Sequence, residues 1–232
     1  MSITWEVGAK KFILSEKADI ISIPLDFDYE SKKSRQPLHF AANRAVKRPM
    51  RVGEFVGDIG KGGSCNAFEF TLNPHCNGTH TETIWHTQEH GPAPYELLSA
   101  PFYLSLLITL NPSNNLGDDS YSVDLNEHDV MLTRADLESE IQKQLKKYDL
   151  NTEDLEALVI RTLPNDGSKI TQNWSQSKST PFLTKEATEL LDELQISHLA
   201  VDFPSLDKSD DDGHLLAHKL FFRDPSRTIT EM

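Results

Sequence analysis

The amino-acid sequence predicts a mixed α/β fold in which two helices are interspersed with six or more short strands. Apolar residues recur at helical spacing in two segments, and short apolar or alternating runs bounded by turn residues recur elsewhere. With 232 residues, of which 38% are hydrophobic and 25% charged, the chain can bury a sizeable core. No internal repeat or clear boundary divides it, so a single domain over residues 1–232 is expected.

The first third of the chain predicts short strands separated by a long polar segment. Residues 3–14 predict one or two strands, and residues 18–25 predict a buried strand that Pro24 ends. Residues 28–53 are polar and predict a loop, of a length typical of functional lids or disordered segments. Residues 66–72 alternate between apolar and polar side chains and predict a half-buried strand.

Further strands are expected where apolar runs follow turn residues. Residues 103–110, 155–163 and 198–203 each predict a buried strand. The polar segments at 111–120 and 165–179 predict loops. The acidic run 207–213 is expected to be exposed, and apolar character resumes over residues 215–222.

Both expected helices begin at a threonine that can cap the helix N-terminus. Thr133 starts a pattern that resembles a capping box, and apolar residues then keep helical spacing to about Lys147. Thr184 begins the second helix. The apolar residues of the two helices are Leu137, Ile141 and Leu145 in the first, and Ala187, Leu190, Leu191 and Leu194 in the second.

Composition excludes several classes of partner. A formal net charge of −13 argues against a nucleic-acid or anionic-membrane surface, because both need clustered Lys and Arg. The longest apolar run, residues 102–110, is too short to span a bilayer, which takes about 20 residues. Two cysteines make no disulfide framework and no secretory signal is recognised, so a cytoplasmic location is expected.

The segment 73–86 concentrates side chains that bind divalent transition metals. It is followed closely by one more histidine, at position 90. The residues of interest are His75, Cys76, His80, Glu82, His86 and His90. A surface turn with solvated histidines is the alternative interpretation, but so many ligand-type residues within so few positions favour a metal site.

Residue parity separates the candidate ligands. In extended backbone, Cys76, His80 and Glu82 point to the same side and could converge on one ion. His75 would face away unless a bend at Asn77-Gly78 resets the register, which these residue types allow. Further ligands would come from distant segments, with His218, Asp202, Asp207 and Glu231 as the candidates.

Several segments resemble motifs of the cyclase-like metal-dependent hydrolases, a family that includes bacterial-type kynurenine formamidase (arylformamidase) and isatin hydrolase. Residues 76–86 resemble its HxGTHxDxPxH motif, and residues 201–207 resemble its IDxPSxD segment. His218 resembles the downstream histidine of the family and Glu231 its late glutamate. Members usually continue past this glutamate, so further residues are expected beyond Met232.

The resemblance assigns a role to each matching residue. It places metal-binding histidines at Cys76 and His80, the bridging aspartate at Glu82 and the catalytic histidine at His86. The remaining metal ligands would be His218 and Glu231, with Thr79, Asp202, Ser205 and Asp207 as substrate or support residues. Cysteine and glutamate replace the usual histidine and aspartate, but both still ligate zinc. Ile84 replaces the proline of the motif, which loosens the loop.

The resemblance also implies a compact swivelling β/β/α domain that forms homodimers or homotetramers and binds zinc or manganese. Its activity would be hydrolysis of a C–N bond in a small non-peptide amide, with His86 moving the proton. Trp85 and Phe40 could line an apolar wall for an aromatic substrate, although core packing is the expected role of both. The alternatives are a metal-binding protein that has lost hydrolysis and a structural zinc site closed by four protein ligands.

Overall fold

The computed structural model describes residues 4–7, 10–14, 17–23, 25, 27, 36–177 and 180–231. The chain forms two compact units. The first, which we call the sheet unit, comprises residues 1–22, 80–165 and 178–232. The second, the hairpin unit, comprises residues 23–79 and 166–177. The mixed α/β class is confirmed, whereas a single domain over the whole chain stays a prediction.

A five-stranded sheet forms the centre of the sheet unit. Four of its strands run parallel, and an antiparallel strand lies at one edge. The expected strands at 103–110, 155–163 and 198–203 are confirmed within a few residues. In spatial order the strands are β7 (His80–Glu82), β13 (Thr228–Glu231), β12 (His198–Val201), β10 (Ala157–Thr162) and β8 (Ser105–Leu110).

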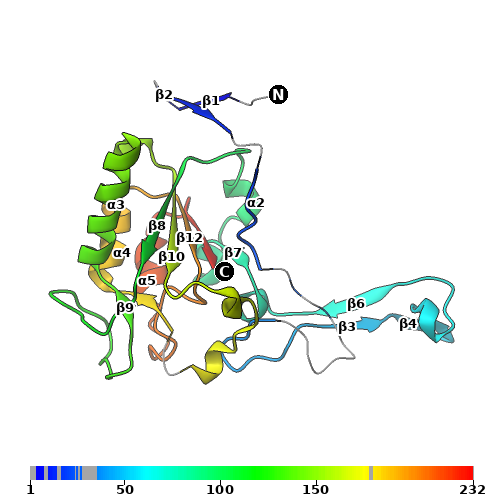
Figure 1. Cartoon of the computed structure of the whole chain (residues 1–232). Coiled ribbons are helices and arrows are strands. Elements are labelled where there is room, and N and C mark those ends of the chain that lie inside the picture. Colours follow the sequence, from blue (N-terminus) through cyan, green and yellow to red (C-terminus); the bar gives the residue numbers. More distant parts are fainter. Residues whose placement is uncertain are drawn as a thin grey trace. The chain divides into compact units, whose positions relative to one another are not determined.

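Three helices pack near this sheet: α3 (Arg134–Tyr148), α4 (Lys185–Glu193) and α5 (Leu216–Phe221). α3 and α4 lie side by side along the sheet (Figure 1). The remaining elements of the unit are small. They include the hairpin of β1 (Thr4–Val7) with β2 (Lys10–Ile13), the parallel pair β9 (Met131–Leu132) with β11 (Phe182–Leu183), and α2 (Pro94–Leu97).

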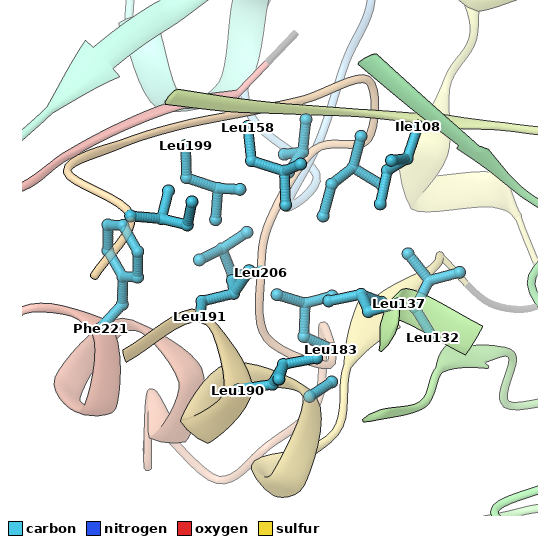
Figure 2. Close-up of a cluster of buried hydrophobic side chains, with 14 of the residues drawn as sticks. Ile108, Leu132, Leu137, Leu158, Leu183, Leu190, Leu191, Leu199, Leu206 and Phe221 are labelled. Atoms are coloured by element: carbon cyan, nitrogen blue, oxygen red, sulfur yellow. The ribbon is translucent and has the colours of Figure 1, made fainter. Parts of the chain in front are cut away.

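Alternate side chains of the parallel strands form the sheet half of the core. Leu106 and Ile108 of β8, Leu158 of β10 and Leu199 of β12 are almost fully buried, and Leu158 is in register with both Leu106 and Leu199. Figure 2 shows Ile108, Leu158 and Leu199 facing side chains of the helices, among them Leu191. The period of two in a strand thus decides which residues meet the helices.

The capped helices form where the sequence predicts them. Thr133 accepts a hydrogen bond from the Asp136 N–H at 3.3 Å, and Asp136 accepts one from the Thr133 N–H at 3.0 Å, which completes a capping box. Thr184 accepts the Ala187 N–H at 3.2 Å. The expected apolar residues of both helices are buried, except Leu194, which directly follows α4 and is half-buried.

The hairpin unit contains two small antiparallel sheets. β3 (Val46–Pro49) pairs with β6 (Phe68–Thr71), and β4 (Arg51–Val52) pairs with β5 (Phe55–Val56). One short helix, α1 (Pro74–Asn77), follows β6. The strand expected at 66–72 is therefore confirmed, although it pairs outside the five-stranded sheet.

Three expectations are wrong. No strand forms among the described residues of 18–25, where Ile20 is 88% exposed; Pro24 lies outside the described residues. The described part of the expected loop at 28–53 contains the strands β3 and β4. The sequence did not predict them because both are polar and lack the apolar alternation of a half-buried strand.

The third expectation, an exposed acidic run at 207–213, is wrong at three positions and confirmed at the other four, residues 209, 210, 212 and 213. Asp207, Lys208 and Asp211 are buried because their side chains form local hydrogen bonds and ion pairs. The described part of the expected loop at 165–179 contains two 3-10 turns, at Gly167–Thr171 and Trp174–Gln176. Among the described residues, no helix has the length and apolar character needed to cross a bilayer.

Candidate metal centre

Strand pairing at the edge of the sheet brings three ligand-type residues together. β7 and β13 are antiparallel, with His80 opposite Glu231 and Glu82 opposite Ile229. Residues directly opposite or two apart in such a pair share a face, so His80, Glu82 and Glu231 lie on one side. Ile229, a residue of the hydrophobic core, lies on the same face.

The donor atoms of these three residues are spaced as in a metal site. One atom each from His80, Glu82 and Glu231 lies within 4.8 Å of the other two. His80 Nε2 is 3.7 Å from Glu82 Oε2 and 3.6 Å from Glu231 Oε2. Two ligands at about 2.1 Å from a tetrahedral zinc are roughly 3.4 Å apart, so small adjustments would let this group hold an ion. Nitrogen and oxygen donors suit zinc and manganese.

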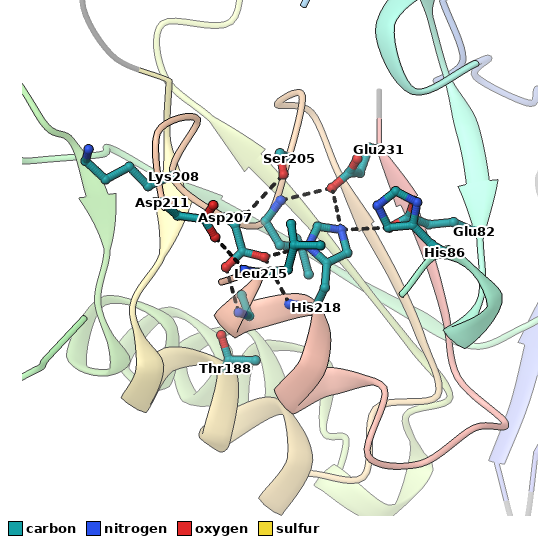
Figure 3. A network of polar contacts seen from close by, with 12 residues as sticks. Glu82, His86, Thr188, Ser205, Asp207, Lys208, Asp211, Leu215, His218 and Glu231 are labelled. Carbon is teal, nitrogen blue, oxygen red and sulfur yellow. Dashed lines mark hydrogen bonds and ion pairs between the residues drawn. The ribbon is translucent and has the colours of Figure 1, made fainter. Parts of the chain in front are cut away.

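His218 of α5 links this group to a third carboxylate, that of Asp207. Its Nε2 lies 2.7 Å from Glu82 Oε1 and 3.4 Å from Glu231 Oε1, and its Nδ1 lies 2.6 Å from Asp207 Oδ2. Figure 3 shows the ring between Asp207 on one side and the two glutamates on the other. A metal-binding histidine characteristically has such a carboxylate on its second ring nitrogen.

The Asp207 side chain also accepts hydrogen bonds from the first turn of the helix that carries His218. Its Oδ1 accepts the Ala217 N–H at 2.7 Å, and its Oδ2 accepts the His218 N–H at 3.2 Å. These N–H groups belong to the first turn of α5, which has no earlier carbonyl to bond them. One carboxylate thereby fixes both the backbone and the ring of His218.

Burial and neighbouring charges both shift the pKa values of His218, Asp207 and Glu231. Burial alone would lower the pKa of His218, but its contacts with Asp207, Glu231 and Glu82 outweigh burial and raise that pKa well above the usual value. Burial would raise the pKa of Asp207, but hydrogen bonding and charge attraction from His218 hold it below its usual range. Burial and the neighbouring Glu82 raise the pKa of Glu231. Without a metal, a protonated His218 therefore balances the buried carboxylates.

A capped 3-10 turn, Ile84–His86, holds His86 beside this group. The Thr83 hydroxyl accepts the Trp85 N–H at 3.3 Å and donates to the Pro92 carbonyl at 2.6 Å. His86 Nδ1 lies 3.5 Å from Glu82 Oε2, and the side chain of His86 is 27% exposed against 4% for Glu82. His86 is therefore the most accessible of the histidines around Glu82.

The residues of the motif before His80 belong to the hairpin unit. Cys76 is in the helical turn α1 and His75 precedes it there, so the extended backbone assumed in the parity argument is wrong at both positions. Cys76 is buried, and burial raises the pKa of its thiol. Thr79 accepts the Ile23 N–H at 2.7 Å. Whether Cys76 or His75 ligates an ion stays a prediction.

Two of the expected support residues stabilise the loop after β12. Asp202 accepts hydrogen bonds from the N–H and the hydroxyl of Thr162, at 2.8 and 2.7 Å, and so joins the ends of β10 and β12. The Ser205 hydroxyl accepts the Asp207 N–H at 3.3 Å. Asp207, in the same loop, contacts His218 of the site.

Trp85 and Phe40 are 56% and 52% exposed, so core packing, their expected role, is wrong for both. The sequence interpretation also missed Tyr121, whose hydroxyl lies 3.1 Å from Asp207 Oδ1. Tyr121 follows a polar loop and carries no motif, so no local pattern could have indicated it.

The class of the protein follows from comparison with known families. The family model described as "Putative cyclase" matches residues 12–208, which is most of the chain. The chain therefore belongs to the cyclase family, as its motifs predict. His218 and Glu231 lie beyond the matched residues, and the structure brings both to Glu82.

Solved structures share this fold. Isatin hydrolase A from Labrenzia aggregata bound to benzyl benzoate is 12% identical, with 91% of this chain and 78% of that chain covered and a TM-score of 0.50. A structure described as a novel cyclase is 14% identical, with 90% and 71% covered and a TM-score of 0.50. A search of the curated proteins found no match.

Proposed function

We propose that this chain is a metal-dependent hydrolase that cleaves a C–N bond in a small, non-peptide amide of aromatic or cyclic type, as an arylformamidase does. The observation that carries the proposal is the group of His80, Glu82 and Glu231, buried on one face of the β7–β13 pair beside the more accessible His86. Membership of the cyclase family supports the same class of activity.

His80, Glu82 and Glu231 would hold the ion, and His218 would add a donor once its Nε2 loses the proton that it shares with Glu82. When bound, a divalent zinc or manganese ion supplies Lewis acidity, which brings the deprotonation of water into the neutral range. Asp207 keeps a proton on Nδ1 of His218, because an ionised carboxylate can only accept, and so leaves Nε2 available.

His86 is suited to proton transfer. Imidazole titrates near neutrality, so it can take a proton from water and return it to a leaving nitrogen. The capped 3-10 turn fixes its backbone, and Glu82 orients its ring through Nδ1. Trp85, more than half exposed in the same turn, offers an aromatic surface for the substrate.

Metal analysis of the purified protein, combined with a panel of small amides that includes N-formylkynurenine, tests the proposal. We expect bound zinc or manganese and hydrolysis of at least one aromatic amide. His86→Ala should remove turnover and leave the metal content almost intact, whereas His80→Ala should lose the metal. His128→Ala is the matched control, because the side chain of His128 is 49% exposed and lies beside Glu127 rather than the centre.

Two outcomes would contradict parts of this reasoning. Bound metal without turnover of any amide would favour a metal-binding protein that has lost hydrolysis, or a structural zinc site. Full activity of His86→Ala would remove His86 as the base. A comparison of Cys76→Ala with His75→Ala, by metal content, decides which residue of α1 is a ligand.

A further inference from the structure

The Tyr121 hydroxyl forms two hydrogen bonds next to the metal centre. Its oxygen accepts the Lys208 N–H at 2.9 Å and lies 3.1 Å from Asp207 Oδ1. Asp207 is ionised and can only accept, so the hydroxyl hydrogen is directed at Oδ1. The Tyr121 ring packs on the buried Phe182, with centroids 4.8 Å apart, which limits the directions in which the hydroxyl can point.

These contacts make Tyr121 the outermost member of a chain of polar contacts. The hydroxyl of Tyr121 meets Oδ1 of Asp207, Oδ2 of Asp207 meets Nδ1 of His218, and Nε2 of His218 meets Glu82. Asp207 is 1% exposed and His218 1%, so solvent competes little for these bonds. The orientation of the carboxylate determines where the imidazole can point.

We propose that Tyr121 is a positioning residue of the metal centre: it holds the Asp207 carboxylate so that His218 presents Nε2 to the ion. The proposal rests on the metal centre of the proposed function, but not on the reaction. The two oxygens of Asp207 have different partners. The Ala217 N–H and Tyr121 hold Oδ1, and the ring and N–H of His218 hold Oδ2. Loss of the hydroxyl leaves the Ala217 N–H alone on Oδ1, so the carboxylate, and with it the ring of His218, is held less tightly.

Tyr121→Phe removes the hydroxyl and keeps the ring on Phe182. Tyr103→Phe is the matched control: the Tyr103 hydroxyl accepts the Ala100 N–H at 3.0 Å, and its ring packs on His198 rather than on a residue of the centre. Both substitutions remove one oxygen that accepts a backbone N–H. A difference between them therefore reports the contact with Asp207.

The experiment measures zinc affinity by competition with a chromophoric chelator, together with the melting temperature of each metal-free variant. We expect Tyr121→Phe to weaken zinc binding about tenfold, at the lower end of the range for partners of a metal-binding histidine. Tyr103→Phe should bind zinc as the wild type does. Affinity for Tyr121→Phe within twofold of the wild type would overturn the proposal.

A double-mutant cycle with Asp207→Asn separates positioning from a general loss of packing. If Tyr121 acts through Asp207, adding Tyr121→Phe to Asp207→Asn should change the zinc affinity by less than twofold. Equal effects of Tyr121→Phe in both backgrounds would refute the relay. Zinc binding by a wild type that hydrolyses no amide would sink the proposed function, while the affinities would still decide the role of Tyr121. A wild type that binds neither zinc nor manganese would overturn both.

Discussion

Removal of His218 should strongly lower the stability of the metal-free protein. Its ring, 2% exposed, makes short contacts with Asp207 at 2.6 Å and Glu82 at 2.7 Å. Hydrogen bonds between charged groups contribute about 1.5–3 kcal/mol each, and breaking a buried ion pair costs roughly 3–5 kcal/mol. We therefore expect His218→Leu to lower the free energy of unfolding by about 4 kcal/mol, a large part of the roughly 5–15 kcal/mol typical of a domain.

The pH dependence has a definite sign. The pKa of His218 is raised in the folded protein, so its stabilisation is fully present below the unfolded value of about 6.5. It is lost as the pH rises from there through the raised folded value. The loss in free energy of unfolding caused by His218→Leu should therefore be largest near pH 6 and become smaller at alkaline pH.

Urea unfolding in the presence of a chelator, at pH 6, 7.5 and 9, measures this difference. His128→Leu, a substitution at a half-exposed histidine, should change the free energy of unfolding by less than about 0.5 kcal/mol. The reasoning fails if His218→Leu costs less than about 1 kcal/mol at pH 6, or if its deficit grows as the pH rises.

Two further predictions concern the turn of His86 and a second buried histidine. Thr83→Val should lower the free energy of unfolding by about 1–2 kcal/mol and reduce amide turnover, because the capped turn holds His86; unchanged turnover would show that the cap is dispensable for activity. His39 is 3% exposed, and its ring has no hydrogen-bond partner among the described residues. Burial lowers its pKa from 6.5 to about 4, so stability should fall by about 3 kcal/mol as the pH drops through this range (2.5 units at about 1.36 kcal/mol each). In urea titrations, His39→Leu should reduce the dependence of the free energy of unfolding on pH. His90→Gln should leave it unchanged, because the side chain of His90 is 90% exposed.

Elements that depend on local signals could be predicted from the sequence. α3 has a capping threonine followed by apolar residues at helical spacing, and β10 is an apolar run of strand length; both form as expected. The strand expected at 18–25 shows the limit of such signals. Ile20 and Ile21 are more than half exposed, because an apolar run predicts burial only where a partner strand is available.

The candidate site was predicted in composition but not in geometry. Glu231 reaches His80 through strand pairing and His218 reaches Glu82 through α5, and neither approach can be read from spacing. The parity argument holds for His80 and Glu82, which share one face of β7. It fails for Cys76, because Asn73-Pro74 starts a helical turn there. The motif identified the ligand types, but tertiary contacts decide which of them meet.

The pairing of β7 with β13 has a kinetic consequence. Thr81 and Thr230, whose hydroxyls are 2.8 Å apart, are separated by 149 positions, so this contact closes a very long loop. Contacts of this kind form late, since the entropy of loop closure is lost before they add stability. Strands β8, β10 and β12 can pair with one another before β13 joins them. In pulse-labelling hydrogen exchange, protection of the β7 amides should therefore appear after that of β10, so the ligands of the centre would converge only as folding ends.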